Sequence, residues 1–151
     1  MKELEDILKV KKDIPTCRKT VIGLFLACGH VKEVMTCVLK PYDLSIEQFN
    51  VLRILRGQKG QALNLQDIQE RMINKMSNTT RLVDKLIKKD LVQRFTCEKN
   101  RRKVEIFITE EGLKLLEVID ELINEAERKI TSNLKEDEII QLNTLLLKLM
   151  S

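Results

Sequence analysis

Apolar residues recur every three or four positions through most of this chain, which predicts a mainly helical protein. The longest such stretch starts at Pro15, a residue suited to a helix start, and runs to Leu39, shortly before Pro41. Its apolar positions follow a heptad-like spacing: Val21, Leu24, Cys28, Val31, Met35 and Val38. This spacing indicates packing against another long helix, either in the same chain or in a second copy of it.

Three shorter helices follow. Ser45 and Gln48 form a capping-box pattern ahead of an apolar helix that ends near Gly57. Asn64 is a suitable N-cap for a short third helix, and a fourth helix is expected over residues 76–89. A short helix, a brief turn and a second helix have the spacing of a helix-turn-helix motif.

The remaining elements are a hairpin and two C-terminal helices. Residues 91–97 and 104–109 alternate like strands, and residues 98–103 between them are expected to form an exposed hairpin tip. A long amphipathic helix then begins near Glu110, and a break at residues 132–135 precedes a last helix. Residues 1–12 are expected to form at most one or two amphipathic turns.

Charge is concentrated in one part of the chain. The 151 residues carry a net charge of +4, with 27 Lys and Arg against 23 Asp and Glu. Residues 71–103 hold eleven of those cations and three acids, a net +8, so the rest of the chain sums to −4. A cationic surface beside small polar side chains is typical of a protein that follows the phosphates of DNA.

The composition argues against several other classes. One histidine, no paired carboxylates at catalytic spacing and no glycine-rich phosphate loop make catalytic residues and cofactors unexpected. The four cysteines form no CxxC pair, so no metal site is expected. No uninterrupted apolar run approaches the ~18–20 residues that span a bilayer, and the N-terminus lacks a secretory pattern. We therefore expect a cytoplasmic protein without a membrane partner.

The start of the fourth helix carries side chains suited to base and phosphate contacts. Asn pairs with adenine, Arg with guanine, and a Thr methyl group contacts the thymine methyl. The expected DNA-binding residues of this helix are Ser77, Asn78, Thr79, Thr80, Arg81 and Lys85. On the hairpin tip they are Asn100, Arg101, Arg102 and Lys103, since a narrow tip can place Arg in a minor groove. The alternative is that these residues cap the helix and form a solvated face.

Residues 44–112 closely resemble the MarR family of winged helix-turn-helix transcriptional regulators. The resemblance lies in MSNTTRLVDKLIKKDLVQR at 76–94 and NRRKVEIFITEEG at 100–112. It implies one domain over residues 1–151, with a winged-helix lobe at about 44–110 and dimerisation helices at about 15–39 and 110–150. It further implies a homodimer that binds pseudo-palindromic double-stranded operator DNA, usually as a repressor, and that is released by a small-molecule effector or by thiol oxidation. The recognition helix and the wing Arg residues would make the DNA contacts.

Two positions depart from the family pattern. Asn100 stands where the wing usually has Asp, and Asp90 stands where Gly usually ends the recognition helix, so a left-handed residue is expected there. The resemblance would place an effector near Tyr42 and Phe49, and a redox-sensing thiol at Cys17. For the single histidine, His30, an interface or surface role is favoured over ligand contact. The alternative functions are a winged-helix module that binds proteins instead of DNA, and a thiol-based redox sensor.

Overall fold

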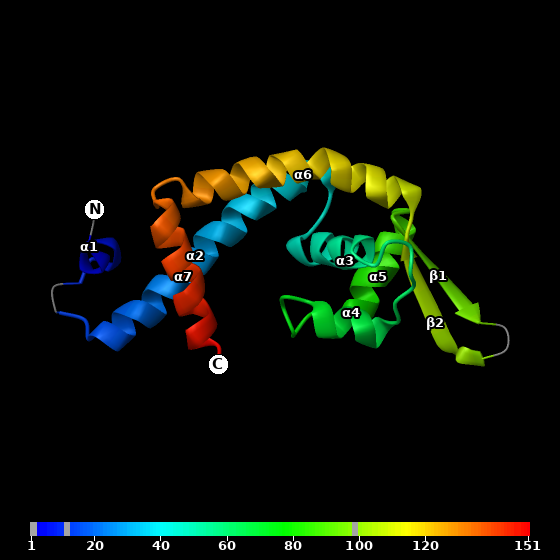
Figure 1. Cartoon of the computed structure of the whole chain (residues 1–151), viewed down its shortest axis with the longest axis horizontal. Coiled ribbons are helices and arrows are strands. Elements are labelled where there is room, and N and C mark those ends of the chain that lie inside the picture. The colour runs from blue at the N-terminus through cyan, green and yellow to red at the C-terminus, as the bar shows by residue number, and fades with distance from the viewer. Residues whose placement is uncertain (1–2, 11–12, 98–99) are drawn as a thin grey trace.

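The computed structural model describes residues 3–10, 13–97 and 100–151, and for residues 97 and 100–103 the description covers the backbone only. The chain is mainly helical, with one antiparallel two-stranded sheet (Figure 1). The elements are α1 (Leu4–Leu8), α2 (Thr16–Leu39), the 3-10 turn η1 (Lys40–Tyr42), α3 (Ile46–Arg56), α4 (Leu65–Arg71), α5 (Thr79–Lys88), β1 (Val92–Cys97), β2 (Asn100–Ile108), α6 (Glu110–Thr131) and α7 (Glu136–Leu149). This confirms the predicted mainly α winged helix-turn-helix class.

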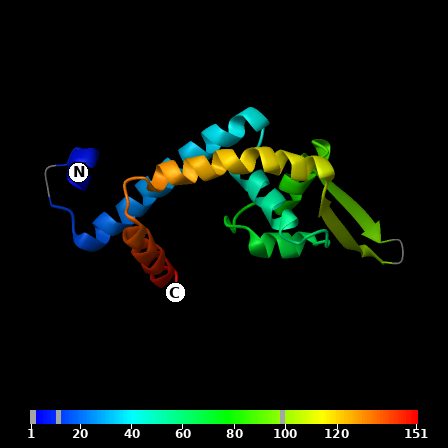
Figure 2. The ribbon, with the colours of Figure 1, turned by 45° about the horizontal axis from the view of Figure 1, so that its top comes forward.

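The long helices form an arm and the middle of the chain forms a lobe. Helices α2 and α6 run side by side, and the lobe of α3, α4, α5 and the sheet lies at one end of them (Figures 1 and 2). At the other end of α6 the chain turns back into α7. The boundaries of α2 agree with the predicted helix at 15–39, and the predicted break at 132–135 separates α6 from α7.

Local capping sets where the lobe helices begin. The Ser45 hydroxyl accepts a hydrogen bond from the Gln48 amide at 3.1 Å, and the Gln48 side chain accepts one from the Ser45 amide at 3.0 Å. Asn64 and Asp67 form the same reciprocal pair at the start of α4. Both N-caps match the sequence prediction, which gave a capping box for Ser45 and Gln48 but only an N-cap for Asn64.

The core joins the lobe to the arm. Lobe side chains such as Val51, Leu52, Ile68, Val83 and Leu86 are fully buried. They form one continuous cluster with residues of α2 and α6, namely Leu39, Leu116, Ile119 and Ile123. A bidentate ion pair adds to this contact, since Arg56 of α3 reaches the two carboxylate oxygens of Asp120 in α6 at 2.5 and 3.1 Å. The orientation of the lobe is therefore fixed by the arm.

The wing differs from its prediction at one end. β2 begins at Asn100 rather than at residue 104, after a register shift at Thr96/Cys97, so residues 100–103 of the predicted tip belong to the strand. Polar residues at 100–103 gave no alternating pattern, but backbone pairing does not require one. Leu63 pairs with Ile106 on the other edge of β2, through bonds of 3.1 and 2.8 Å, and ties the wing to the lobe.

Asp90 adopts the left-handed conformation that the sequence predicted. Its φ is 58°, and its carbonyl oxygen accepts a hydrogen bond from the Thr109 hydroxyl at 2.7 Å. Thr109 also caps α6, because its Oγ1 accepts from the Gly112 amide at 3.0 Å. The end of α5 and the start of α6 are thus joined through one threonine.

Much apolar surface on the arm lies uncovered in the single chain. Among the described residues, α7 contains no buried side chain, and Phe25 on α2 is 75% exposed. Other exposed apolar residues of these helices are Val21, Leu26, Ile140, Leu145, Leu147 and Leu149. Uncovered apolar area of this extent indicates a binding surface rather than a solvated one.

By length and composition alone, the 27-residue helical stretch Thr16–Tyr42 also passes a test for membrane spans, since an 18-residue window within it has a mean hydropathy of 1.6. The sequence expectation used a different criterion and is not contradicted by this finding. It counted uninterrupted apolar runs, whereas Lys32 and Glu33 are the only charged residues between positions 20 and 39. A long helix that packs against other helices passes the same test.

Candidate nucleic-acid interface

The turn between α4 and α5 is held by a set of local hydrogen bonds. Gln69 of α4 accepts a bond from the Thr79 hydroxyl of α5 and donates one to the Lys75 carbonyl at 2.8 Å. The Asn50 side chain accepts from the Ile73 amide at 2.9 Å. Gln69 therefore fixes the angle between the two helices of the motif, and sequence reasoning did not identify it, because its partners lie six and ten residues away.

The recognition helix starts later than predicted. α5 begins at Thr79 rather than at residue 76, because the Asn78 side chain caps it by accepting from the Arg81 amide at 3.0 Å. Ser77 precedes the helix, and its Oγ is buried without a hydrogen-bond partner among the described residues. The alternative that Asn78 caps the recognition helix is thus confirmed. Asn78 is nevertheless an exposed residue.

Thr79 is buried, unlike the other residues of the expected DNA-binding set on this helix. Its residue surface is 5% exposed, and its hydroxyl is used by Gln69. It therefore belongs to the packing between α4 and α5, since the side chain at a helix's first position points toward the neighbouring helix here. Thr80 and Arg81, the next two residues, are exposed.

The exposed face of α5 carries unpaired cations. No ion pair within the described residues involves Arg81, Lys85 or Lys88, whereas Asp84 is paired with Arg94 of β1 at 2.8 Å. Arg81, Lys85 and Lys88 are four and three residues apart, so these three cations share one face of the helix. Lys88 was not named in the predicted site. The side chains of the four predicted wing residues, Asn100 to Lys103, lie outside the described residues, although their backbone is the first part of β2.

The same surface carries two exposed apolar side chains that the sequence did not single out. Met76 is 92% exposed and Ile73 is 84% exposed, both in the turn that precedes α5. They stand beside the polar start of the recognition helix, where apolar side chains can contact sugars or thymine methyl groups.

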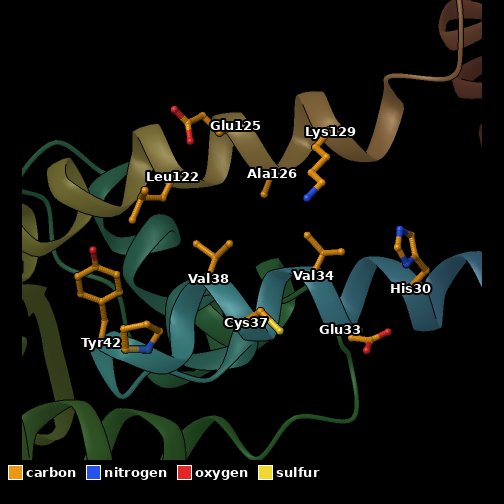
Figure 3. A pocket seen from close by; sticks show the side chains of 11 residues that line it. His30, Glu33, Val34, Cys37, Val38, Tyr42, Leu122, Glu125, Ala126 and Lys129 are labelled. Carbon is orange, nitrogen blue, oxygen red and sulfur yellow. The ribbon is translucent and has the colours of Figure 1, made fainter.

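A cavity of about 680 Å³ lies between the arm helices (Figure 3). Val34, Val38 and His30 of α2 point toward α6, while Leu122, Ala126 and Lys129 point back toward α2, and Tyr42 stands at one end. The predicted effector position near Tyr42 thus coincides with this cavity. Phe49 does not line it, since that ring is buried in the lobe core.

Three of the four cysteines lie on one helix of the arm. Cys17, Cys28 and Cys37 all lie on α2 as exposed free thiols. No group of His, Cys, Asp or Glu able to hold a metal ion occurs among the residues that were placed.

Comparison with known proteins identifies the fold family. A model of the MarR family matches residues 44–104. The HTH-type transcriptional regulator PecS of Dickeya dadantii is 35% identical over 111 residues, which cover 72% of this chain and 66% of PecS. The crystal structure of a MarR transcription factor from Planctomyces limnophilus matches at a TM-score of 0.70 and 29% identity, covering 90% of this chain and 98% of that one.

The chain belongs to the MarR family. The family consists of transcriptional regulators. A variant of Escherichia coli MarR complexed with operator DNA has the same fold, with a TM-score of 0.78 at 22% identity over 99% of this chain and 100% of that one. The stretches of this chain that match the first curated relatives span 44% to 70% of those relatives' own lengths.

Proposed function

We propose that this MarR-family chain is a sequence-specific double-stranded DNA-binding repressor that acts as a homodimer in the cytoplasm and has no enzymatic activity. The observation that carries the proposal is the exposed face of α5, where Thr80 is accessible and Arg81 and Lys88 have no ion-pair partner among the described residues. Phosphates are the partners that such unpaired cations attract most strongly. The operator-bound E. coli relative supports the same assignment.

In the proposed complex, two copies of the chain each present the same α5 surface and wing to one DNA duplex. The start of α5, with Asn78, Thr80 and Arg81, would read base edges in the major groove, while Lys88 contacts the backbone. Arg101 and Arg102 of the wing would enter the adjacent minor groove. Two such units would fit half-sites about 34 Å apart, one helical turn of DNA.

The direct test is selection of bound duplexes from a random pool, using the full chain. The expected result is an inverted repeat with one helical turn between half-site centres. Recovery of no enriched sequence would instead favour the winged-helix module that binds proteins.

Arg81→Gln and Lys59→Gln make a matched pair of charge deletions, on α5 and on the turn before α4. For the selected operator, Arg81→Gln should weaken binding by about 1–3 kcal/mol, the range of one good base contact. Lys59→Gln should change it by less than about 0.5 kcal/mol, as for a surface substitution away from the interface. Equal effects in a gel-shift titration would indicate that Arg81 acts only through the overall charge of the chain and not through a contact between α5 and DNA. Arg102→Ala should also weaken binding by about 1–3 kcal/mol if the wing contacts DNA.

The releasing signal has two candidate sites, both on the arm. A small-molecule effector would occupy the cavity between α2 and α6, and an oxidant would act on the exposed thiol of Cys17. If the thiol is the sensor, peroxide should release the operator from the wild-type chain but not from Cys17→Ser. Equal release from both proteins would exclude Cys17 as the sensor.

A further inference from the structure

Two apolar side chains stand out from the turn between α4 and α5, and we call Ile73 and Met76 the apolar pair. They are 84% and 92% exposed, the highest values among the large apolar side chains of the described residues. Met72, next to them in the chain, is 1% exposed and belongs to the core. The turn thus buries one apolar side chain and leaves two in solvent.

The backbone that carries the apolar pair is held in place. The Asn50 side chain of α3 accepts a hydrogen bond from the Ile73 amide at 2.9 Å, and the Asn74 side chain accepts one from the Met76 amide at 3.1 Å. The Asn74 carbonyl also accepts from the Ser77 amide at 3.1 Å. A backbone fixed before binding lowers the entropy cost of any contact that the two side chains make.

The chain around the apolar pair is cationic. Residues 71–81 contain Arg71, Lys75 and Arg81 and no acid, and all three cations are exposed. Apolar groups set among cations fit a polyanion that itself carries apolar groups. A DNA major groove meets both requirements, because phosphates border it and the thymine methyl is the apolar group that its base edges present.

The apolar pair also adjoins the proposed DNA-binding surface. Met76 lies two residues before Asn78, the N-cap of α5. The turn and the start of α5 lie on the same side of the lobe, away from α6 (Figure 1). A duplex that takes the start of α5 into its major groove therefore brings the neighbouring base pairs to the turn.

We propose that the apolar pair recognises thymine, with Met76 and Ile73 each contacting the methyl group of one thymine in an operator half-site. The inference rests on the proposed function and adds a base preference to it. Phosphate contacts carry no sequence information, whereas contact with a methyl group favours thymine over cytosine, which has none. Each half-site should therefore contain thymine beside the bases that α5 contacts.

The test combines truncated side chains with truncated bases. Met76→Ala and Ile73→Ala shorten side chains that are exposed, so neither change removes a core contact. Gln61→Ala is the control, because Gln61 is an exposed, unbranched residue in the turn before α4. Each full-length protein is titrated by gel shift with the selected operator, and with copies in which one thymine of both half-sites is replaced by deoxyuridine. Uracil pairs with adenine as thymine does and lacks only the methyl group.

One thymine should depend on Met76 and a second on Ile73. For the wild-type chain, deoxyuridine at either position should lower affinity by about fourfold per half-site, the effect of one buried methyl group. Met76→Ala should bind the thymine operator more weakly and distinguish thymine from uracil at its position by less than about twofold, since the two changes remove the same contact. Ile73→Ala should behave likewise at the second position, and Gln61→Ala should keep both wild-type ratios.

Several outcomes would overturn the inference. One is a wild-type chain that binds thymine and uracil operators equally at every position. Another is that Met76→Ala and Ile73→Ala both keep the wild-type ratios, or weaken both kinds of operator by the same factor, because other groups then contact the methyls. A chain that selects an operator but gives any of these results contradicts thymine recognition alone. A chain that selects no duplex contradicts the proposed function, and this inference with it.

Discussion

Gly112 lies where α6 begins against the end of the wing. A Cβ atom at this position would clash with the carbonyl oxygen of Leu91 and lie 2.8 Å from Cγ1 of Ile108. The Leu91 carbonyl cannot move easily, since it accepts the Thr109 amide at 3.1 Å. The absence of a side chain thus lets the first turn of α6 pack directly on the backbone between α5 and β1.

Gly112→Ala should lower the free energy of unfolding by about 2–3 kcal/mol, the upper part of the range for overpacking a filled site. Gly57→Ala is the control, because Gly57 has a φ of −61° and its Cβ would lie 3.4 Å from the Ile54 carbonyl. That variant should stay within about 0.5 kcal/mol of wild type. Urea denaturation of both variants measures the difference in the free energy of unfolding. Equal values would show that the first turn of α6 can shift to accommodate the added methyl group.

Asp90 is the other residue whose backbone sets the geometry here. Its left-handed φ of 58° strains a residue with a Cβ atom, although Asp tolerates this region better than most. Asp90→Gly should remove that strain and raise the free energy of unfolding by up to about 1 kcal/mol, partly offset by the larger entropy of the unfolded chain. Thermal unfolding monitored by circular dichroism checks the sign. A lower melting temperature would mean that the Asp side chain contributes a favourable interaction.

Among the elements, α4 and α5 are joined across their turn by the side chain of Gln69. Gln69→Ala removes two hydrogen bonds and leaves the buried Thr79 hydroxyl without its acceptor. We expect the free energy of unfolding to fall by about 1–3 kcal/mol, the cost of an unsatisfied buried polar group. Gln66→Ala, on the same helix but exposed and bonded only to Glu70, should cost less than about 0.5 kcal/mol. Denaturant titrations would contradict this role of Gln69 if both substitutions had the same effect.

The elements also show what a sequence pattern can and cannot predict. The ends of α2 and α3 and the cap of α4 depend on residues that are adjacent or three apart, so Pro15, Ser45 and Asn64 indicated them correctly. The first residue of β2 depends on backbone pairing with β1, which leaves no apolar alternation at Asn100. Burial of Thr79 depends on Gln69, a contact between two helices, and nothing in the local sequence distinguishes Thr79 from the exposed Thr80. The cavity that Lys40 and Lys85 both line was missed for the same reason, because only the fold brings these two residues together.

At the scale of the whole molecule, the exposed apolar faces of α2 and α7 are the argument for a homodimer. Phe25→Glu places a charge on the most exposed aromatic side chain of the arm, far in the sequence from every proposed DNA contact. If two copies pack through this face, the variant should elute with the mass of one 17.6 kDa chain, while wild type elutes with twice that mass. A second copy supplies half of the base contacts, so operator affinity should also fall more than tenfold.

Gln61→Glu adds the same charge on the lobe and should leave both properties unchanged. Light scattering coupled to size exclusion, followed by gel shift, provides the two readings. A Phe25→Glu protein that remains dimeric would place the interface elsewhere on the arm. A monomeric variant with full operator affinity would show that one lobe is enough for DNA binding.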